Sequence, residues 1–146
     1  VATVDEVCTV GDLGYVVTTT SKEGYGGDIQ ITVGITTDGT VNGVSILSLS
    51  ETAGLGMKAT EPAFYEQYHG KQTESFYVSK DGGSGEPIEA LSGATITSRA
   101  VTGAVNVALG YVLNSVDCRI YGTISARRFG EYIAIEANLY GSSRDG

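Results

Sequence analysis

The sequence predicts an α+β domain in which a mostly antiparallel sheet is backed by helices. Three observations favour this fold class. Glycine is abundant at 21 residues and Trp is absent, a composition that suits strands and loops better than a helix bundle. A tight-turn signal joins two alternating apolar stretches, and a long apolar stretch at helical spacing follows near residue 100. At 146 residues the chain is long enough to bury one core without cross-links.

The first half of the chain carries the strand signals. Residues 13–20 are predicted to form a strand, and residues 29–36 and 41–49 are predicted to form a hairpin. Asp38-Gly39 lies between the last two stretches, and this dipeptide is typical of a tight hairpin turn.

Helices are expected in the second half. Residues 61–68 are predicted to form a short helix, with Thr60 as its N-cap and Pro62 in its first turn. A short strand at 75–78 and a flexible loop at 80–86 follow. Residues 98–113 are predicted to form the long helix, because apolar positions recur there at helical spacing.

Residues 1–114 are expected to form one domain and residues 115–146 a C-terminal extension. Within the extension, 120–126 and 131–139 alternate well enough to pair as a hairpin, and the last residues are expected to be a disordered tail. The sequence leaves open whether the extension is native, dimer-forming or partly a cloning product. Because the hairpin would be neutral and apolar, self-association by edge-to-edge pairing is a hypothesis.

The charge distribution argues against several partners. The formal net charge is −8, and residues 1–114 hold 13 Asp/Glu against 5 Lys/Arg, whereas residues 115–146 hold four of each. An acidic body without basic stripes argues against nucleic acid and against direct adhesion to anionic lipid. No hydrophobic run approaches the roughly 20 residues that cross a bilayer. Because the chain begins at Val1 rather than Met, an N-terminal piece is expected to be missing.

Metal and hydrolytic chemistry find little support in the sequence. His69 is the only histidine and is expected to cap the end of the short helix, so no metal site is predicted. Cys8 and Cys118 are far apart in sequence; a disulfide is allowed, but no metal pattern is formed. No serine-hydrolase elbow or dinucleotide-binding fingerprint is complete. Glu51 and Glu61 are expected on solvated faces.

The most informative stretch is 92–99, Ser-Gly-Ala-Thr-Ile-Thr-Ser-Arg, which places small residues and hydroxyls at the beginning of the predicted long helix. Gly93 and Ala94 let a bulky group approach the backbone. Thr95 offers a hydroxyl beside them, and either Thr97 or Ser98 is expected to be the N-cap. Unpaired N–H groups and the positive end of the helix dipole then favour a phosphate near Thr95. Ordinary caps and turns have the same composition, which is the alternative interpretation.

Four segments resemble the FMN-binding domain family, which includes the G subunit of Rnf-type electron transport complexes and the C subunit of sodium-translocating NADH:quinone reductases. Ser92-Gly-Ala-Thr95 resembles the family's flavinylation motif. The other three segments are similar to its glycine turn before a strand, its E-T-P-G-L-G loop and a turn upstream of the motif; they are Gly24-Tyr-Gly-Gly27, Glu51-Thr-Ala-Gly-Leu-Gly56 and Ser79-Lys-Asp-Gly-Gly83. The resemblance covers roughly residues 13–113 and is strongest to the Rnf subunit.

The resemblance implies that Thr95 carries FMN through a phosphoester bond. It also implies contacts to the flavin or its phosphate from Ser92, Gly93, Ala94, Thr97, Glu51, Thr52, Gly54, Leu55, Gly56, Met57 and Lys80. Lys80 would offset negative charge near the ring or phosphate, or else be an ordinary solvated lysine. Tyr25 would stack on the ring, or else belong to the core.

Two positions depart from the family pattern. Ala53 replaces the usual Pro of the glycine-rich loop, which loosens the loop but removes no ligand. Glu89 stands three residues before the motif, where the family usually has an Asp that the flavin transferase is thought to read. Because Glu89 keeps the charge and extends the reach by one methylene, it is the expected recognition residue.

The resemblance therefore implies a covalent FMN-carrying electron-transfer domain of a membrane-bound, ion-translocating oxidoreductase, an electron carrier rather than a stand-alone enzyme. The expected partners are the other subunits of the complex and a flavin transferase. The expected location is the extracytoplasmic face of the cell membrane, with an N-terminal anchoring helix outside this sequence. Two alternatives stay open: a flavin-bearing domain of another extracytoplasmic reductase or lipoprotein, and a non-redox extracytoplasmic ligand-binding module.

Overall fold

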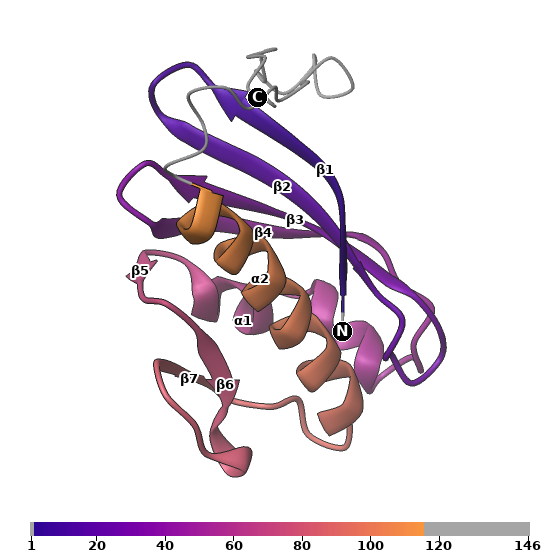
Figure 1. The fold of residues 1–146 in the computed structure, drawn as a ribbon. Coiled ribbons are helices and arrows are strands. Elements are labelled where there is room, and N and C mark those ends of the chain that lie inside the picture. Colours follow the sequence, from indigo (N-terminus) through magenta and orange to yellow (C-terminus); the bar gives the residue numbers. More distant parts are fainter. Residues whose placement is uncertain (1, 116–146) are drawn as a thin grey trace.

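The main sheet of the protein is antiparallel and follows the order of the chain (Figure 1). The computed structural model describes residues 2–115, so the elements expected beyond residue 115 and Cys118 lie outside the described residues. The sheet runs in the order β1-β2-β3-β4-β5. Its strands are β1 (Thr3–Val10), β2 (Gly14–Ser21), β3 (Ile29–Thr36), β4 (Thr40–Ser48) and β5 (Lys71–Gln72). The antiparallel sheet expected from the sequence is confirmed.

Strand β1 is the longest element that the sequence analysis missed, and a bulge explains why. The register of β1 against β2 shifts between Val4 and Glu6. Val4 and Val7 therefore both pack against the core although they are three residues apart. This spacing interrupts the period-two alternation by which a strand is recognised.

The β3–β4 hairpin forms at the dipeptide that predicts it. Gly39 adopts a φ of +88°, a left-handed conformation that glycine tolerates, and its N–H donates to the carbonyl of Thr36 at 2.9 Å. The Asp38 carboxylate accepts hydrogen bonds from the Thr36 hydroxyl and from the Thr40 N–H. These bonds lower the pKa of the Asp38 carboxyl, and the bond from the Thr36 hydroxyl has the largest effect.

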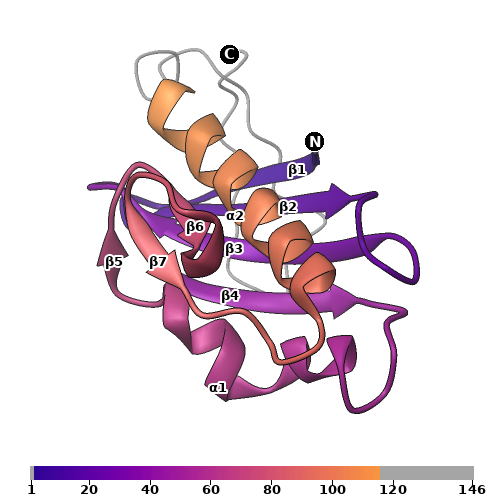
Figure 2. The ribbon, with the colours of Figure 1, turned by 90° about the horizontal axis from the view of Figure 1, so that it is seen from below.

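Helix α2 (Thr95–Ser115) is the long core helix and crosses one face of the sheet (Figure 2). It begins three residues earlier than the sequence predicts. Small residues on its buried face, among them Ala104 and Ala108, let the helix lie close to β2 and β3. The Thr19 hydroxyl of β2 donates to the carbonyl of Ala104 at 3.1 Å and joins the two layers.

The apolar character of α2 is that of a core helix. Its residues Thr95–Asn114 are long and apolar enough to cross a membrane by length and composition alone, contrary to the sequence expectation. More than half of this apolar stretch is buried inside the fold, against the sheet. Core helices of globular domains pass the same test, so this helix is not evidence of a membrane span.

The predicted helix at 61–68 is divided into shorter pieces. They are α1 (Pro62–Tyr65) and η2 (Glu66–Tyr68), and a separate 3₁₀ turn, η1 (Gly56–Thr60), precedes them. Thr60 is not the N-cap of α1, because its hydroxyl donates to the carbonyl of Met57 at 2.9 Å and Glu61 occupies the cap position. Pro62 does stand in the first turn of α1, as predicted.

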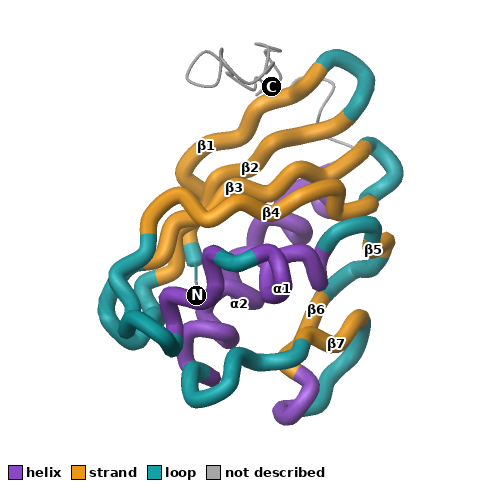
Figure 3. Tube along the Cα trace, turned by 180° about the vertical axis from the view of Figure 1, so that it is seen from behind, coloured by secondary structure: helices purple, strands orange, loops and turns teal. Residues whose placement is uncertain are grey.

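A small second sheet flanks the loop expected at 80–86, of which residues 82–85 are neither helix nor strand. Strands β6 (Phe76–Val78) and β7 (Glu86–Ile88) pair in parallel, and η3 (Ser79–Asp81) follows β6. The Asn106 amide of α2 accepts the N–H of Phe76 at 2.8 Å and donates to its carbonyl at 2.9 Å. Seen from behind, this sheet and the helices lie on the same side of the main sheet (Figure 3).

A buried polar pair joins the short helices to α2 and yields a stability prediction. The Tyr68 hydroxyl lies 2.8 Å from Thr102 Oγ1, and burial raises the pKa of the Tyr68 phenol well above its usual value. Tyr68→Phe should lower the free energy of unfolding by about 1–3 kcal/mol, because it leaves a buried hydroxyl without this partner. Urea denaturation measures the change. The double variant Tyr68→Phe/Thr102→Val should recover part of the loss, and additive losses would contradict the coupling.

Candidate functional site

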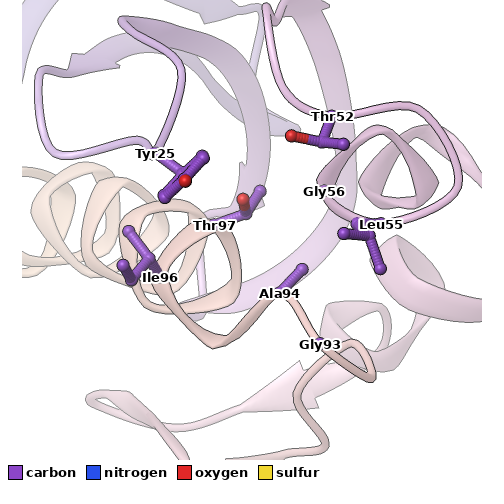
Figure 4. Close-up of a pocket in the computed structure, with 8 residues that line it drawn as sticks. All are labelled: Tyr25, Thr52, Leu55, Gly56, Gly93, Ala94, Ile96 and Thr97. Carbon is purple, nitrogen blue, oxygen red and sulfur yellow. The ribbon is translucent and has the colours of Figure 1, made fainter.

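A cavity of about 370 Å³ opens beside the first turn of α2, a size within the range of small-molecule sites, about 300–1,000 Å³. Three segments that are distant in sequence converge on it. Figure 4 shows Thr52 and Leu55 on one side and Tyr25 and Ile96 on the other. The lining residues are Tyr25, Thr52, Leu55, Gly56, Gly93, Ala94, Ile96 and Thr97.

The beginning of α2 is fixed by a tight turn at residues 91–94. Gly93 has a φ of +73°, and the Ala94 N–H donates to the carbonyl of Leu91 at 3.0 Å. The Ser98 hydroxyl donates to the carbonyl of Ala94 at 2.9 Å and accepts the N–H of Leu91 at 2.8 Å. The prediction of Thr97 or Ser98 as N-cap is therefore wrong, because both lie inside the first turn.

Thr95 is the first residue of α2 and is half-buried. Lys80 Nζ donates to Thr95 Oγ1 at 3.2 Å, so an exposed cation stands at the hydroxyl. The first turn of a helix also leaves backbone N–H groups without intrahelical acceptors. A negatively charged group bonded to Thr95 would therefore meet both a lysine and the positive end of α2.

An ion pair holds η3, and with it Lys80, against α2. Arg99 Nη2 and Nε donate to the two oxygens of Asp81 at 2.6 and 2.8 Å. The hydrogen bond from Arg99 lowers the pKa of the Asp81 carboxyl, and the same bond raises the pKa of the Arg99 guanidinium. The cation beside Thr95 is thus placed by a neighbouring pair of charges.

Glu51 is buried, so its expected place on a solvated face is wrong. Its side chain accepts the Thr97 hydroxyl at 2.5 Å and the backbone N–H groups of Tyr25 and Gly26 at 2.8 and 2.7 Å. Burial of a carboxylate is tolerated when it is hydrogen-bonded in this way. Glu51 lies behind the cavity wall and is not among the lining residues.

The expected contact residues fall into two groups. Those that line the cavity are Thr52, Leu55, Gly56, Gly93, Ala94 and Thr97. Those that lie outside its lining are Ser92, Gly54, Met57, Lys80, Glu51 and Thr95 itself. Tyr25 is 71% exposed and lines the cavity, which rules out the alternative of a core tyrosine.

Ile96 is the lining residue that sequence reasoning missed. Its side chain is 46% exposed although it belongs to the apolar core helix. The available signal was its position next to Thr95, because consecutive helical residues point in different directions and cannot all face the core.

Glu89 and His69 lie away from the cavity. Glu89 is exposed, and its backbone is held by the side-chain amide of Gln67, with bonds of 2.7 and 3.2 Å. His69 stands at the end of η2, as expected, and its Nε2 accepts the N–H of Val44 at 2.9 Å. Within residues 2–115, no three His, Cys, Asp or Glu side chains gather closely enough to hold a metal ion.

The residues present fit a cofactor with a phosphate and a flat ring. A hydroxyl and a cation are adjacent at the beginning of α2, where a phosphate is favoured. The cavity beside them has apolar walls in Leu55 and Ile96 and a glycine wall in Gly56 and Gly93. The fold and the site therefore fit one class of protein, α+β domains that bind a phosphate-bearing aromatic ligand between glycine-rich loops and a core helix.

Comparison with known proteins identifies this class. The sequence model of the FMN-binding domain family matches residues 24–110, and the chain belongs to that family.

Two curated relatives are G subunits of ion-translocating complexes. The chain is 44% identical over 100 residues to the G subunit of the proton-translocating ferredoxin:NAD(+) oxidoreductase complex of Clostridium ljungdahlii, covering 68% of this chain and 54% of that protein. It is 41% identical over 101 residues to the Na(+)-translocating counterpart of Acetobacterium woodii, covering 66% and 48%. The chain therefore spans about half the length of these relatives, and its resemblance to the Rnf-type G subunit is confirmed.

Two solved structures share the fold. The C subunit of the Na(+)-translocating NADH-quinone reductase of Parabacteroides distasonis aligns with a TM-score of 0.58 at 24% identity, over 73% of this chain and 59% of that chain. NqrC of Shewanella oneidensis aligns with a TM-score of 0.54 at 27% identity, over 71% and 54%. The predicted α+β fold class is confirmed by these likenesses.

The close packing of Gly56 yields a prediction for the cavity wall. A Cβ at Gly56 would lie 2.5 Å from Thr97 Oγ1 and 2.6 Å from Glu51 Cβ. Gly56→Ala should therefore destabilise the fold by about 1–3 kcal/mol, measured by urea denaturation. Gly103→Ala is the matched control, because a Cβ there meets nothing within 4 Å and Ala stabilises a helix by about 1 kcal/mol. A Gly56→Ala variant as stable as the parent would contradict this packing.

The Asp81–Arg99 pair yields a pH prediction. Because the pKa of Asp81 is lowered in the fold, the pair contributes above the unfolded-state pKa, about 3.9 for Asp, and is lost as pH falls through the lower folded-state pKa. The NMR signal of the Arg99 Nε–H should therefore be constant from pH 7 to 5 and move only in stronger acid. Asp81→Asn should shift it at every pH. A midpoint between pH 5 and 7 would contradict the assignment.

Proposed function

We propose that this chain is a covalent FMN-carrying electron-transfer domain of a membrane-bound, ion-translocating oxidoreductase of the Rnf type. The observation that carries the proposal is the half-buried hydroxyl of Thr95, which lies at the beginning of α2, 3.2 Å from Lys80 Nζ. A cavity large enough for a flat ring adjoins the same turn. Membership of the FMN-binding domain family supports FMN as the ligand.

In this proposal, each part of the site has one task. FMN supplies reversible uptake of electrons, which the amino acid side chains do not provide. Thr95 Oγ1 would carry the FMN phosphate as a phosphoester, and the backbone N–H groups of the first turn of α2 would be the donors closest to that phosphate. Lys80 offsets the phosphate charge at close range. Leu55 and Ile96 exclude water from the two sides of the ring.

The outer residues of the site have supporting roles in the same proposal. Ser92 and Gly54 shape the turns that carry the lining residues. Met57 is 37% exposed and offers a soft contact at the mouth of the cavity. Glu89 is exposed on the segment that leads to the motif, where a flavin transferase could read its carboxylate.

The proposed partners and location extend this function to the whole complex. The relatives named above are subunits of multi-subunit complexes, which supports other subunits of such a complex as electron partners of this chain. We place the domain on the extracytoplasmic face of the membrane, next to an N-terminal anchor. Self-association through residues 115–146 is a separate proposal, for which light scattering of the full chain is the test.

Covalent attachment is tested by co-expression with a flavin transferase. The parent should gain the mass of one FMN residue and fluoresce in a denaturing gel, because the phosphoester survives unfolding. Thr95→Ala should lose both signals while its circular dichroism stays that of the parent. Thr95→Ser keeps a hydroxyl and should retain some flavin. Thr37→Ala removes the hydroxyl of an exposed threonine in the β3–β4 turn and should be labelled like the parent.

Either of two results would overturn this proposal. Flavin fluorescence retained by denatured Thr95→Ala would place the bond elsewhere. A colourless parent of unmodified mass, co-expressed with an active transferase, would favour a non-redox ligand-binding module.

A further inference from the structure

We propose that Glu51 is a positioning residue that assembles the flavin cavity from behind its wall and makes the bound flavin harder to reduce. The effect of Glu51 on the flavin rests on the proposed function. The assembly of the cavity by Glu51 concerns the protein without cofactor and does not depend on that function. Glu51 does not line the cavity, so it acts through the residues that do.

The hydrogen bonds of Glu51 reach two of the three segments around the cavity, and Glu51 itself belongs to the third. Oε1 accepts the N–H of Tyr25 at 2.8 Å and the hydroxyl of Thr97 at 2.5 Å. Oε2 accepts the N–H of Gly26 at 2.7 Å. Tyr25 and Thr97 line the cavity, and the next residue after Glu51, Thr52, lines it too. One carboxylate therefore joins the glycine turn, the glycine-rich loop and the beginning of α2.

Two glycines let the backbone approach Glu51 closely enough for these bonds. A Cβ at Gly26 would lie 1.9 Å from the carbonyl oxygen of Ser50 and 3.1 Å from Glu51 Oε2. A Cβ at Gly56 would lie 2.6 Å from Glu51 Cβ. The shortest contact at each position is closer than real Cβ atoms approach, so only glycine fits there without a shift of its neighbours. Gly26 and Gly56 are thus explained by close packing around Glu51 and the residue before it.

Because Glu51 is buried, its carboxylate depends on hydrogen bonds from the protein. Glu51 is 9% exposed, and a buried carboxylate needs donors to replace water. The two backbone N–H groups and the hydroxyl that it contacts all act as donors, which is the pattern that suits an ionised carboxylate. Removing the carboxylate leaves these three groups without their acceptor, so the three segments lose their common anchor.

The charge of Glu51 has a second consequence for a bound flavin. Reduction adds negative charge to the ring system, and a nearby carboxylate in a partly desolvated place opposes it. Thr97 lies between the carboxylate and the cavity and donates its hydroxyl proton to Glu51. Glu51 thus lowers the reduction potential of the flavin without touching it.

The experiment compares Glu51→Gln, Glu51→Asp and a matched control, Glu61→Gln. Glu61 is an exposed carboxylate whose side chain makes no capping hydrogen bond to α1. Amide hydrogen exchange at Tyr25 and Gly26 is measured by NMR in the protein without cofactor. FMN affinity is then measured in a Thr95→Val background, and the reduction potential in the flavinylated proteins. Circular dichroism establishes that each variant is folded.

The proposal expects Glu51→Gln to speed exchange of Tyr25 and Gly26 about tenfold and to weaken FMN binding about tenfold, the effect of losing one buried charged partner. Its reduction potential should become more positive. Glu51→Asp keeps the charge, so its potential should stay near that of the parent although its exchange is faster. Glu61→Gln should match the parent in all three measurements.

The outcomes separate the two proposals. Unchanged exchange at Tyr25 and Gly26 in Glu51→Gln would overturn the anchoring role, whatever the flavin does. Faster exchange with unchanged FMN affinity and potential would overturn the role toward the flavin. A parent protein that binds no FMN would overturn the proposed function, and with it this role, while the exchange data still decide the anchoring.

Discussion

The packing of α2 against the sheet is the constraint on which the rest of the structure depends. Small side chains such as Ala104 and Ala108 bring the helix close to β2 and β3, and the Thr19 hydroxyl joins the layers. This packing fixes the axis of the helix, and the turn at 91–94 fixes where the helix begins. Thr95 is consequently the half-buried first residue of the helix, between two residues that line the cavity, Ala94 and Ile96.

The site itself is shallow, and this explains why a covalent bond would be useful. Three of its lining residues, Tyr25, Leu55 and Ile96, are more than one-third exposed. Such an open site leaves the ring accessible for electron exchange with neighbours, but its limited burial favours dissociation of a free ligand. A bond to Thr95 keeps the flavin at high effective concentration without closing the site. The open cavity then keeps the flavin ring accessible, and the bond to Thr95 keeps the flavin on the protein.

Local signals in the sequence were sufficient for most of the fold. Strand β3 alternates without interruption from Ile29 to Ile35, and Asp38-Gly39 specifies its turn, so this hairpin could be predicted. Strand β1 could not, because its bulge removes the period on which recognition depends. The beginning of α2 was misplaced because Thr97 and Ser98 have the composition of caps but use their hydroxyls for Glu51 and for the turn before the helix.

The site was predictable where it depends on motifs and not where it depends on contacts distant in sequence. The glycine-rich loop and the residues before α2 were recognised from their resemblance to a family. Glu51 was expected in solvent because a carboxylate is rarely buried without partners, and its partners are 25, 26 and 46 residues away. Ile96 was missed because its neighbours in α2 face the core. Both residues became evident only once the three segments were placed together.

A crystal structure of the protein after treatment with a flavin transferase is the most direct test of the central claim. The account predicts continuous electron density from Thr95 Oγ1 to a phosphorus atom beside Lys80, with the ring between Leu55 and Ile96. Density joined to another hydroxyl, or a ring bound on the opposite face of the sheet, would contradict it.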